Sequence, residues 1–275
     1  MPVIDFHIHT YDYPIQGPPE FIEFMNRELR GSFDDFVRAR CNAANYLKVL
    51  DEAGIDYAVI LAELAPVTSA IASNEGVSRL CAGTSRLLPF ASINPFLTDH
   101  LDRELERLIV KEHFRGVKLY PTYQFFYPND ARIYPLYAKA QELGIPVLLH
   151  TGSSVFPASR IKYGDPLYLD DVAVDFPELN IVLAHSGRPF WYDRAFALAR
   201  FRPHIYMELS GLPPSRLMRY FPELERVGDK VIFGSDWPSV PTLKENVAAI
   251  RALPISEEVK TKILGGNAAR ILKLT

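Results

Sequence analysis

Two histidines near the start of the chain, His7 and His9, have the spacing of two metal ligands on one β-strand. They lie in the segment 3–10, where apolar and polar side chains alternate with the two-residue period of a strand. The apolar positions are Ile4, Phe6 and Ile8, and the polar ones are Asp5, His7 and His9. Since side chains two residues apart point the same way, both imidazoles can bind one ion. A surface strand whose polar face meets water has the same pattern, so the rest of the chain decides between these interpretations.

The composition argues against several classes of protein. The chain has 275 residues, 48% of them hydrophobic, and a formal net charge of -3, so it can bury a sizeable core but lacks the charge to bind nucleic acid or a membrane surface. No apolar run approaches the roughly 20 residues of a membrane span, and the first residues do not resemble a signal sequence. The two cysteines suggest no disulfide framework. We therefore expect a cytoplasmic protein that acts on a small-molecule substrate.

The remainder of the chain alternates between predicted strands and predicted helices. The eight predicted strands cover residues 3–10, 55–62, 87–93, 115–120, 145–150, 180–185, 204–210 and 230–236. Helices follow them, including one over 69–83 and one over 214–227. Strict alternation predicts an α/β fold with a parallel sheet, and eight units match a single-domain (β/α)8 TIM barrel over residues 1–275, a fold of about 250 residues. An open doubly wound sheet usually has fewer strands, and no GxGxxG motif follows the first strand.

Polar residues end several of these strands, where the active site of such a barrel lies. They are His7, His9, Lys118, Tyr120, His150, His185, Glu208, Ser210 and Asp236. A single histidine or aspartate at a strand end is usually a cap, but such endings on strands one, five, six and eight rarely coincide by chance. If His185 points inward, strand alternation places Val182 and Ala184 against the helices. Imidazole and carboxylate groups that converge in this way suit zinc and similar divalent ions.

The strand ends and several short sequence motifs resemble the amidohydrolase superfamily, in particular its amidohydrolase-related (amidohydrolase 2) branch. The motifs are 4–9 (IDFHIH), 116–119 (GVKL), 183–187 (LAHSG), 233–238 (FGSDWP) and 266–270 (GNAAR). The resemblance covers the whole chain. It implies one divalent ion, zinc with manganese or another ion as alternatives, held by His7, His9, His150 and Asp236. It also suggests a homodimer.

The resemblance also implies a chemistry. The branch contains hydrolases of lactones and amides, and metal-dependent, non-oxidative decarboxylases of aromatic and unsaturated acids. We expect a metal-dependent hydrolase in which Asp236 is the general base for a water molecule and His185 stabilises the oxyanion or assists proton transfer. The alternatives are a decarboxylase on the same scaffold and a non-catalytic barrel that only binds a ligand.

Four residues are candidates for binding the substrate. Arg188, in the loop after strand six, can bind a carboxylate bidentately. Tyr120 and Trp237 each adjoin a strand that carries a predicted site residue. Lys118 is expected to contact the substrate or a ligand carboxylate.

Lys118 and Asp5 leave alternatives open. Many two-metal members of the superfamily carry a carboxylated lysine on strand four, whereas a lysine buried against Asp5 or Glu208 would have no role in binding. We favour one ion and an uncarboxylated Lys118. Asp5 is expected to point inward below the ion and to support the ligands without binding it.

Overall fold

Eight strands form one parallel sheet in the part of the chain that the computed structural model describes, residues 1–238 and 243–274. They are β1 (Ile4–His9), β2 (Tyr57–Leu61), β3 (Leu87–Ser92), β4 (Gly116–Leu119), β5 (Val147–His150), β6 (Ile181–Ala184), β7 (Ile205–Glu208) and β8 (Val231–Ile232), and neighbours in sequence are neighbours in space. Phe6 N donates to Phe233 O (3.0 Å) and His9 N to Trp237 O (2.8 Å), which joins β1 to the segment after β8. The predicted (β/α)8 barrel is therefore confirmed.

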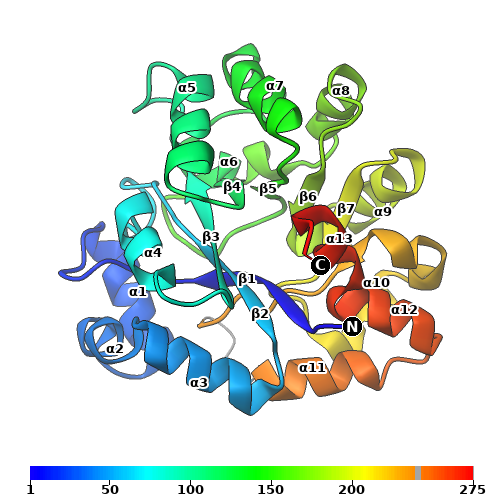
Figure 1. Cartoon of the computed structure of the whole chain (residues 1–275), viewed down its shortest axis with the longest axis horizontal. Helices are drawn as coiled ribbons and strands as arrows, with labels where there is room; N and C mark the ends of the chain where they lie inside the picture. Colours follow the sequence, from blue (N-terminus) through cyan, green and yellow to red (C-terminus); the bar gives the residue numbers. More distant parts are fainter. Residues whose placement is uncertain (239–242, 275) are drawn as a thin grey trace.

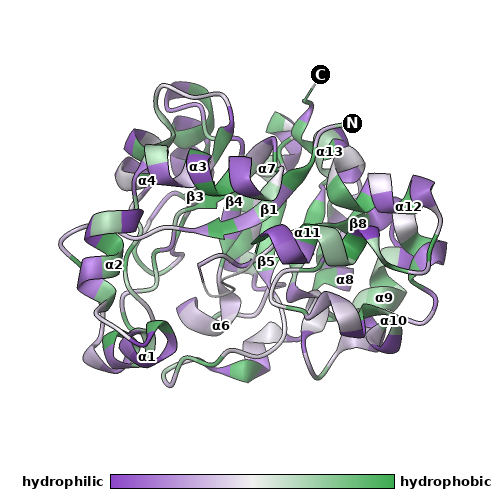
Figure 2. Cartoon of the chain, turned by 90° about the horizontal axis from the view of Figure 1, so that it is seen from below, coloured by the Kyte–Doolittle hydropathy of each residue, from purple (hydrophilic) through white to green (hydrophobic). Residues whose placement is uncertain are grey.

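Helices surround the strands (Figure 1). They are α1 (Pro19–Leu29), α2 (Phe33–Arg40), α3 (Ala43–Ala53), α4 (Asn74–Cys81), α5 (Leu101–Glu106), α6 (Pro121–Gln124), α7 (Tyr134–Leu143), α8 (Tyr168–Asp175), α9 (Tyr192–Phe201), α10 (Leu217–Tyr220), α11 (Leu243–Arg251), α12 (Glu257–Thr261) and α13 (Asn267–Leu272). Within residues 1–238 and 243–274, none is long and apolar enough to cross a membrane. Figure 2 places α1 and α6 at one end of the barrel and both termini with α13 at the other.

Two helices are shorter than the sequence predicts. The helix expected over 69–83 begins at Asn74, where Ser73 Oγ accepts a hydrogen bond from Gly76 N (3.0 Å) and so caps the first turn. The helix expected over 214–227 is broken into short segments, and α10 ends at Tyr220. Pro222 disfavours helical geometry at the residue before it, which explains the break.

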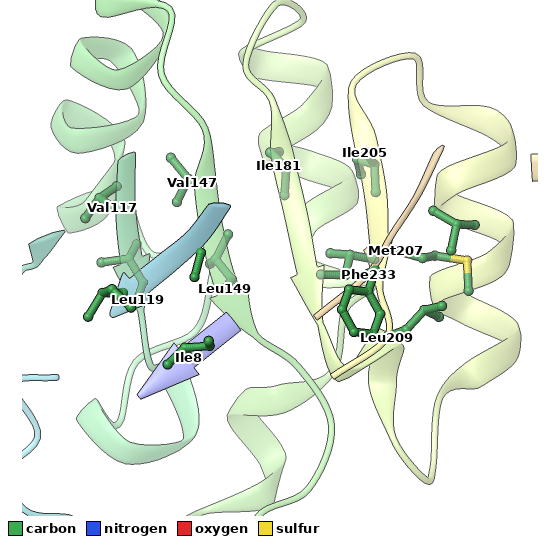
Figure 3. Close-up of a cluster of buried hydrophobic side chains, with 14 of the residues drawn as sticks. Ile8, Val117, Leu119, Val147, Leu149, Ile181, Ile205, Met207, Leu209 and Phe233 are labelled. Atoms are coloured by element: carbon green, nitrogen blue, oxygen red, sulfur yellow. The ribbon is translucent and has the colours of Figure 1, made fainter. Parts of the chain in front are cut away.

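Both faces of the strands are buried, which explains their nearly continuous apolar sequences. One set of side chains fills the barrel interior and includes Ile4, Phe6, Val59, Leu61, Phe90, Leu148, Val182, Ala184 and Ile232, with Ile271 and Leu272 of α13 packed against it. Residues of opposite parity lie between the strands and the helices, as Figure 3 shows for Val117, Leu119, Val147, Leu149 and Ile181. This interior layer packs beneath the polar residues at the strand ends and supports them.

The strict alternation expected for the first strand is wrong beyond Asp5. Asp5 pairs with Ala58 and Ile8 with Ile60, so β1 holds one extra residue relative to β2. This bulge leaves Phe6 in the barrel interior and Ile8 in the outer layer (Figure 3 shows Ile8). It also turns the two histidines inward.

The inward position expected for Asp5 is also wrong, because Asp5 alternates with Ile4 and Phe6, which both face the interior. The side chain is buried, and its Oδ1 accepts hydrogen bonds from His7 N (3.1 Å) and Ser235 N (2.9 Å). Asp5 therefore supports the backbone on either side of the seam between β1 and β8.

Candidate active site

A cavity of about 510 Å³ opens at the carboxyl ends of the strands. Its polar wall contains seven of the residues that end strands or follow them: His7, His9, Glu63, His150, His185, Arg188 and Asp236. Its apolar wall comes from α1 and from the loop after β5, and includes Phe24, Met25, Leu29, Val155 and Phe156. The cavity thus combines ionisable groups on the barrel side with an apolar cover.

Three potential ligand atoms meet at the bottom of this cavity. His7 Nε2 and His9 Nε2 are 3.2 Å apart, and Asp236 Oδ1 lies 3.5 Å from the first and 3.2 Å from the second. Ligands held at about 2.0–2.1 Å in a tetrahedron are separated by about 3.3 Å. The spacing of these three atoms therefore fits a single divalent ion.

Buried carboxylates stand behind both histidines. Glu208 Oε2 of β7 lies 3.2 Å from His7 Nδ1, and Glu63 Oε2, after β2, lies 3.3 Å from His9 Nδ1. A carboxylate that accepts from Nδ1–H keeps the Nε2 lone pair on the ligand side, as in known metal-binding histidines. In the sequence, Glu208 was recognised only as the polar end of a strand. Glu63 has a similar place directly after β2, and its role behind His9 appears only in the structure.

Charge around Asp236 keeps its carboxylate ionised. Burial raises the pKa of Asp236, but the imidazoles of His185, His9 and His7 outweigh burial and hold that pKa well below its usual value. Burial lowers the pKa of His9, whereas its bonds to Asp236 and Glu63 raise it, to about 9 overall. The cluster thus attracts positive charge strongly, whether that charge is a proton or a metal ion.

His185 reaches the cavity by a different route from the one the sequence predicts. Val182 and Ala184 face the barrel interior, so their expected position against the helices is wrong. β6 ends at Ala184, and His185 and Ser186 adopt left-handed backbone angles (φ 64° and 46°) that turn the imidazole inward. Strand periodicity does not extend through such a turn.

The hydrogen bond of His185 defines its tautomer. Its Nδ1 lies 3.0 Å from the backbone O of Ser210. A carbonyl oxygen only accepts, so Nδ1 carries the proton and Nε2 has a free lone pair. Burial lowers the pKa of His185 well below its usual value, which keeps the ring neutral. His185 is therefore arranged to accept a proton.

His150, the fourth predicted ligand, lines the cavity but stays outside the cluster of three ligand atoms. Its ring centroid is 4.7 Å from that of His185, and its Nε2 lies 3.1 Å from Ser153 O. By the same argument Nε2 carries the proton, so Nδ1 is the nitrogen with a free lone pair. The structure thus brings together three of the four predicted ligands.

The four predicted substrate-binding residues are placed differently from one another. Arg188 and Tyr120 line the cavity, and each donates a hydrogen bond to a backbone carbonyl, Gly211 O (2.9 Å) and Ala62 O (2.8 Å) respectively. Trp237 does not reach the cavity: its indole packs edge-to-face on Tyr46, 5.1 Å between centroids, in the outer layer.

Lys118 is buried beneath the cavity. Its Nζ has no hydrogen-bond partner among the described residues and lies 5.2 Å from the ring centroid of Tyr120. Burial lowers the pKa of Lys118 to about 8. The side chain contributes positive charge from below and is not part of the cavity wall.

An aromatic series links the apolar cover to the histidines, and sequence reasoning did not single out most of it. Phe24 of α1 packs on Phe156 (5.5 Å between centroids), Phe156 on Tyr123 (5.3 Å), and Tyr123 on His150 (4.8 Å). Two signals in the sequence pointed to α1: the length of the segment after β1, since long loops of this kind are usually functional, and the amphipathic pattern of residues 20–29. A flat substrate would fit against this series of rings.

Comparisons with known proteins agree with the barrel fold and identify the family. A family model described as Amidohydrolase matches residues 4–274. The chain is 24% identical to a 2-keto-4-carboxy-3-hexenedioate hydratase of a Sphingobium species, over 93% of this chain and 87% of the relative. It is similar to the solved structure of an uncharacterized TIM-barrel protein of Bordetella bronchiseptica (26% identity, 99% of each chain, TM-score 0.80). It also resembles a 2,6-dihydroxybenzoate decarboxylase from Rhizobium (19% identity, 100% of this chain and 99% of the other, TM-score 0.73).

Proposed function

The chain belongs to the amidohydrolase family, and we propose that it is a metal-dependent hydrolase of a small carbonyl compound, such as a lactone or an amide, that carries a carboxylate. The observation that carries this proposal is the cluster of His7 Nε2, His9 Nε2 and Asp236 Oδ1 beside the neutral imidazole of His185. An ion site next to a proton acceptor is the arrangement that hydrolysis by an activated water requires.

We assign one ion to this site, with zinc as the first choice. Two imidazoles and a carboxylate are ligands that zinc binds tetrahedrally, and His150 can add its Nδ1 as a further ligand. Manganese or another divalent ion is the alternative. An ion bound here supplies a water molecule whose pKa is lowered to about 7 and an electrophile that polarises a carbonyl oxygen.

The protein's own groups divide the remaining work. Asp236 is ionised, and its Oδ2, outside the cluster of ligand atoms, accepts a proton from the attacking water. His185 begins unprotonated at Nε2, so it cannot donate to an oxyanion at the start. It accepts the proton that Asp236 has taken from the water and passes it to the leaving oxygen or nitrogen. Arg188 binds the substrate carboxylate at the cavity wall.

Decarboxylation of an aromatic or unsaturated acid is the second candidate, because the rings of Tyr123 and Phe156 suit a planar substrate and Arg188 suits a carboxylate. One relative is named as a hydratase, so addition of water to a double bond is a further possibility for this scaffold. A similar structure is named as a decarboxylase, which supports loss of carbon dioxide as a candidate reaction. The cluster of three ligand atoms and His185 are compatible with all three reactions.

A substrate panel separates the three reactions. Protein loaded with zinc or with manganese is incubated with lactones and amides of carboxylic acids, with hydroxybenzoates, and with unsaturated keto acids. We expect opening of a lactone ring with release of one acid equivalent, or cleavage of an amide with release of an amine, and no gas in either case. Release of carbon dioxide would show decarboxylation and replace this proposal by the second candidate. Loss of the double-bond absorbance without release of carbon dioxide would show hydration instead. If the metal-loaded protein binds these compounds without turning them over, the remaining interpretation is a non-catalytic barrel that only binds a ligand.

Gly211 provides a test of the role of Arg188. A Cβ at Gly211 would overlap Arg188 Nη1, so Gly211→Ala should displace the guanidinium. The same Cβ would lie 3.0 Å from Asp236 Oδ2, so this variant can also lower kcat, and the role of Arg188 is read from KM alone. A charged hydrogen bond contributes about 1.5–3 kcal/mol, so KM for a carboxylate substrate should rise about 10–100-fold, as in Arg188→Met. Steady-state kinetics with a carboxylate substrate and its neutral ester measure the effect, which should be absent for the ester.

Gly54→Ala is the matched control for backbone strain. Gly54 has φ 68°, close to the 66° of Gly211, but a Cβ there meets nothing within 4 Å. Both variants should lose similar stability, and only Gly211→Ala should change KM. An unchanged KM in Arg188→Met would remove Arg188 from the substrate site.

A further inference from the structure

A buried serine, Ser210, contacts both the ion side and the substrate side of the site. Ser210 follows β7 and is fully buried. Its Oγ lies 3.0 Å from His7 Nδ1, 2.8 Å from His185 Nδ1 and 2.7 Å from Glu208 Oε2. One hydroxyl thus links a proposed metal ligand, the proposed proton acceptor and a carboxylate.

The donors and acceptors around this hydroxyl allow one consistent arrangement. Ser210 Oγ–H donates to Glu208 Oε2, which leaves the lone pairs of Oγ to accept from the two imidazoles. His7 and His185 then both carry the proton on Nδ1 and a lone pair on Nε2. Ligand-type atoms of His7, His185 and Glu208 lie within 4.8 Å of one another. The hydroxyl at their centre accounts for that closeness without a second ion.

The same end of β7 holds the backbone turn that carries His185. His185 N donates to Glu208 Oε2 (3.3 Å), and Ser186 Oγ donates to Glu208 O (2.9 Å). Both residues have left-handed backbone angles, which residues with a Cβ adopt only when their surroundings hold them there. Residues 208–210 therefore hold the His185 turn in place through these hydrogen bonds.

We propose that Ser210 is a positioning residue that orients the His185 ring, so that its Nε2 faces the substrate beside the ion. This inference rests on the proposed function of the site. His7 keeps the carboxylate of Glu208 at 3.2 Å when the hydroxyl is lost, whereas His185 loses its 2.8 Å contact and keeps only the Ser210 carbonyl. Loss of the hydroxyl therefore affects proton transfer more than metal binding.

The test compares Ser210→Ala with Ser210→Thr, which keeps a hydroxyl, and with Ser210→Cys in case the extra methyl group does not fit. We expect Ser210→Ala to lower kcat about 10–100-fold, with KM and bound metal within about twofold of the wild type. A variant whose side chain can still donate to Glu208 and accept from His185 should recover most of kcat. A parallel loss of metal, or no loss of kcat, would overturn the proposal.

Thr151→Val is the matched control. Thr151 is also a buried hydroxyl at a strand end, and its Oγ1 donates to Ala184 O (2.7 Å) and accepts from Gly187 N (3.0 Å). It holds the same turn but touches neither imidazole of the Ser210 group. Thr151→Val should lower the unfolding temperature with a smaller effect on kcat. An equal loss of kcat in both variants would show that only the turn matters and would overturn the role of Ser210.

A measurement without substrate separates failure of this inference from failure of the proposed function. Nitrogen NMR of the histidine rings in the zinc-loaded protein reports which nitrogen of each ring carries the proton. We expect His185 to be protonated on Nδ1 in both proteins, because the Ser210 carbonyl still accepts in Ser210→Ala, but the Nδ1–H signal should shift and broaden once the hydroxyl no longer holds the ring. The Nε2–H form in the wild type, or an Nδ1–H signal of His185 that is unchanged in Ser210→Ala, would overturn the positioning role whatever the reaction proves to be.

Discussion

Asp236→Asn is expected to lower kcat by a factor on the order of 10³ or more while the barrel stays folded. The carboxylate contributes one of the three clustered ligand atoms, and it is the group that the surrounding imidazoles keep ionised. An amide of the same shape neither accepts a proton at neutral pH nor offers the charge that a divalent ion requires. The measurement is kcat on the substrate identified by the panel, with far-UV circular dichroism and the unfolding temperature recorded for each variant.

Asp5→Asn is the control for this variant. Asp5 is also a buried carboxylate of the barrel, and burial raises its pKa to about 7. Its Oδ1 accepts from His7 N and Ser235 N, and the Oδ1 of asparagine accepts in the same way. Turnover should fall far less than in Asp236→Asn. Unchanged turnover in folded Asp236→Asn would end the assignment of Asp236 as general base.

The second large effect concerns bound metal. Protein purified without chelator should hold about one divalent ion per chain, and His7→Asn and His9→Asn should each hold less than about a tenth of that. Each variant removes one Nε2 from a cluster whose atoms are 3.2–3.5 Å apart, and two remaining ligands bind an ion weakly. Elemental analysis by mass spectrometry measures the content directly. Added zinc should raise the unfolding temperature of the metal-free wild type and not that of the variants.

His113→Asn is the matched control for the metal experiment. His113 is exposed, precedes β4 at the end of the barrel away from the cavity, and has φ 62°, an angle that asparagine tolerates. This variant should keep the full metal content. Metal retained by both His7→Asn and His9→Asn, or absent from the wild type, would show that the cluster is not a metal site.

The first strand shows where prediction from sequence reaches its limit within the site. The spacing of His7 and His9 predicted correctly that the two rings meet, because both obey the local two-residue period. The side on which they meet depends on the extra residue in β1, and Asp5 falls on the other side for the same reason. A bulge arises from the pairing of β1 with β2, which no local period records.

The site residues after the strands depend still more on tertiary structure. His185 lies in a left-handed turn held by Glu208 and Ser210, more than twenty residues away, and Trp237 leaves the seam beside β1 toward the outer layer. The partners of His7 and His9, Glu208 and Glu63, come from β7 and from the end of β2. Contacts at such separations become visible only when the barrel closes.

The eight strands, the barrel and the residue types at the strand ends could therefore be predicted from local sequence patterns. Burial on both faces of a strand and alternation along it are local properties, written in consecutive side chains. Which atoms face one another depends on the closed barrel. This applies to the three-atom cluster of His7, His9 and Asp236, to the separate position of His150, and to the tautomer of His185. Bulges and turns at the barrel rim rotate these side chains, and their geometry follows from closure of the whole sheet.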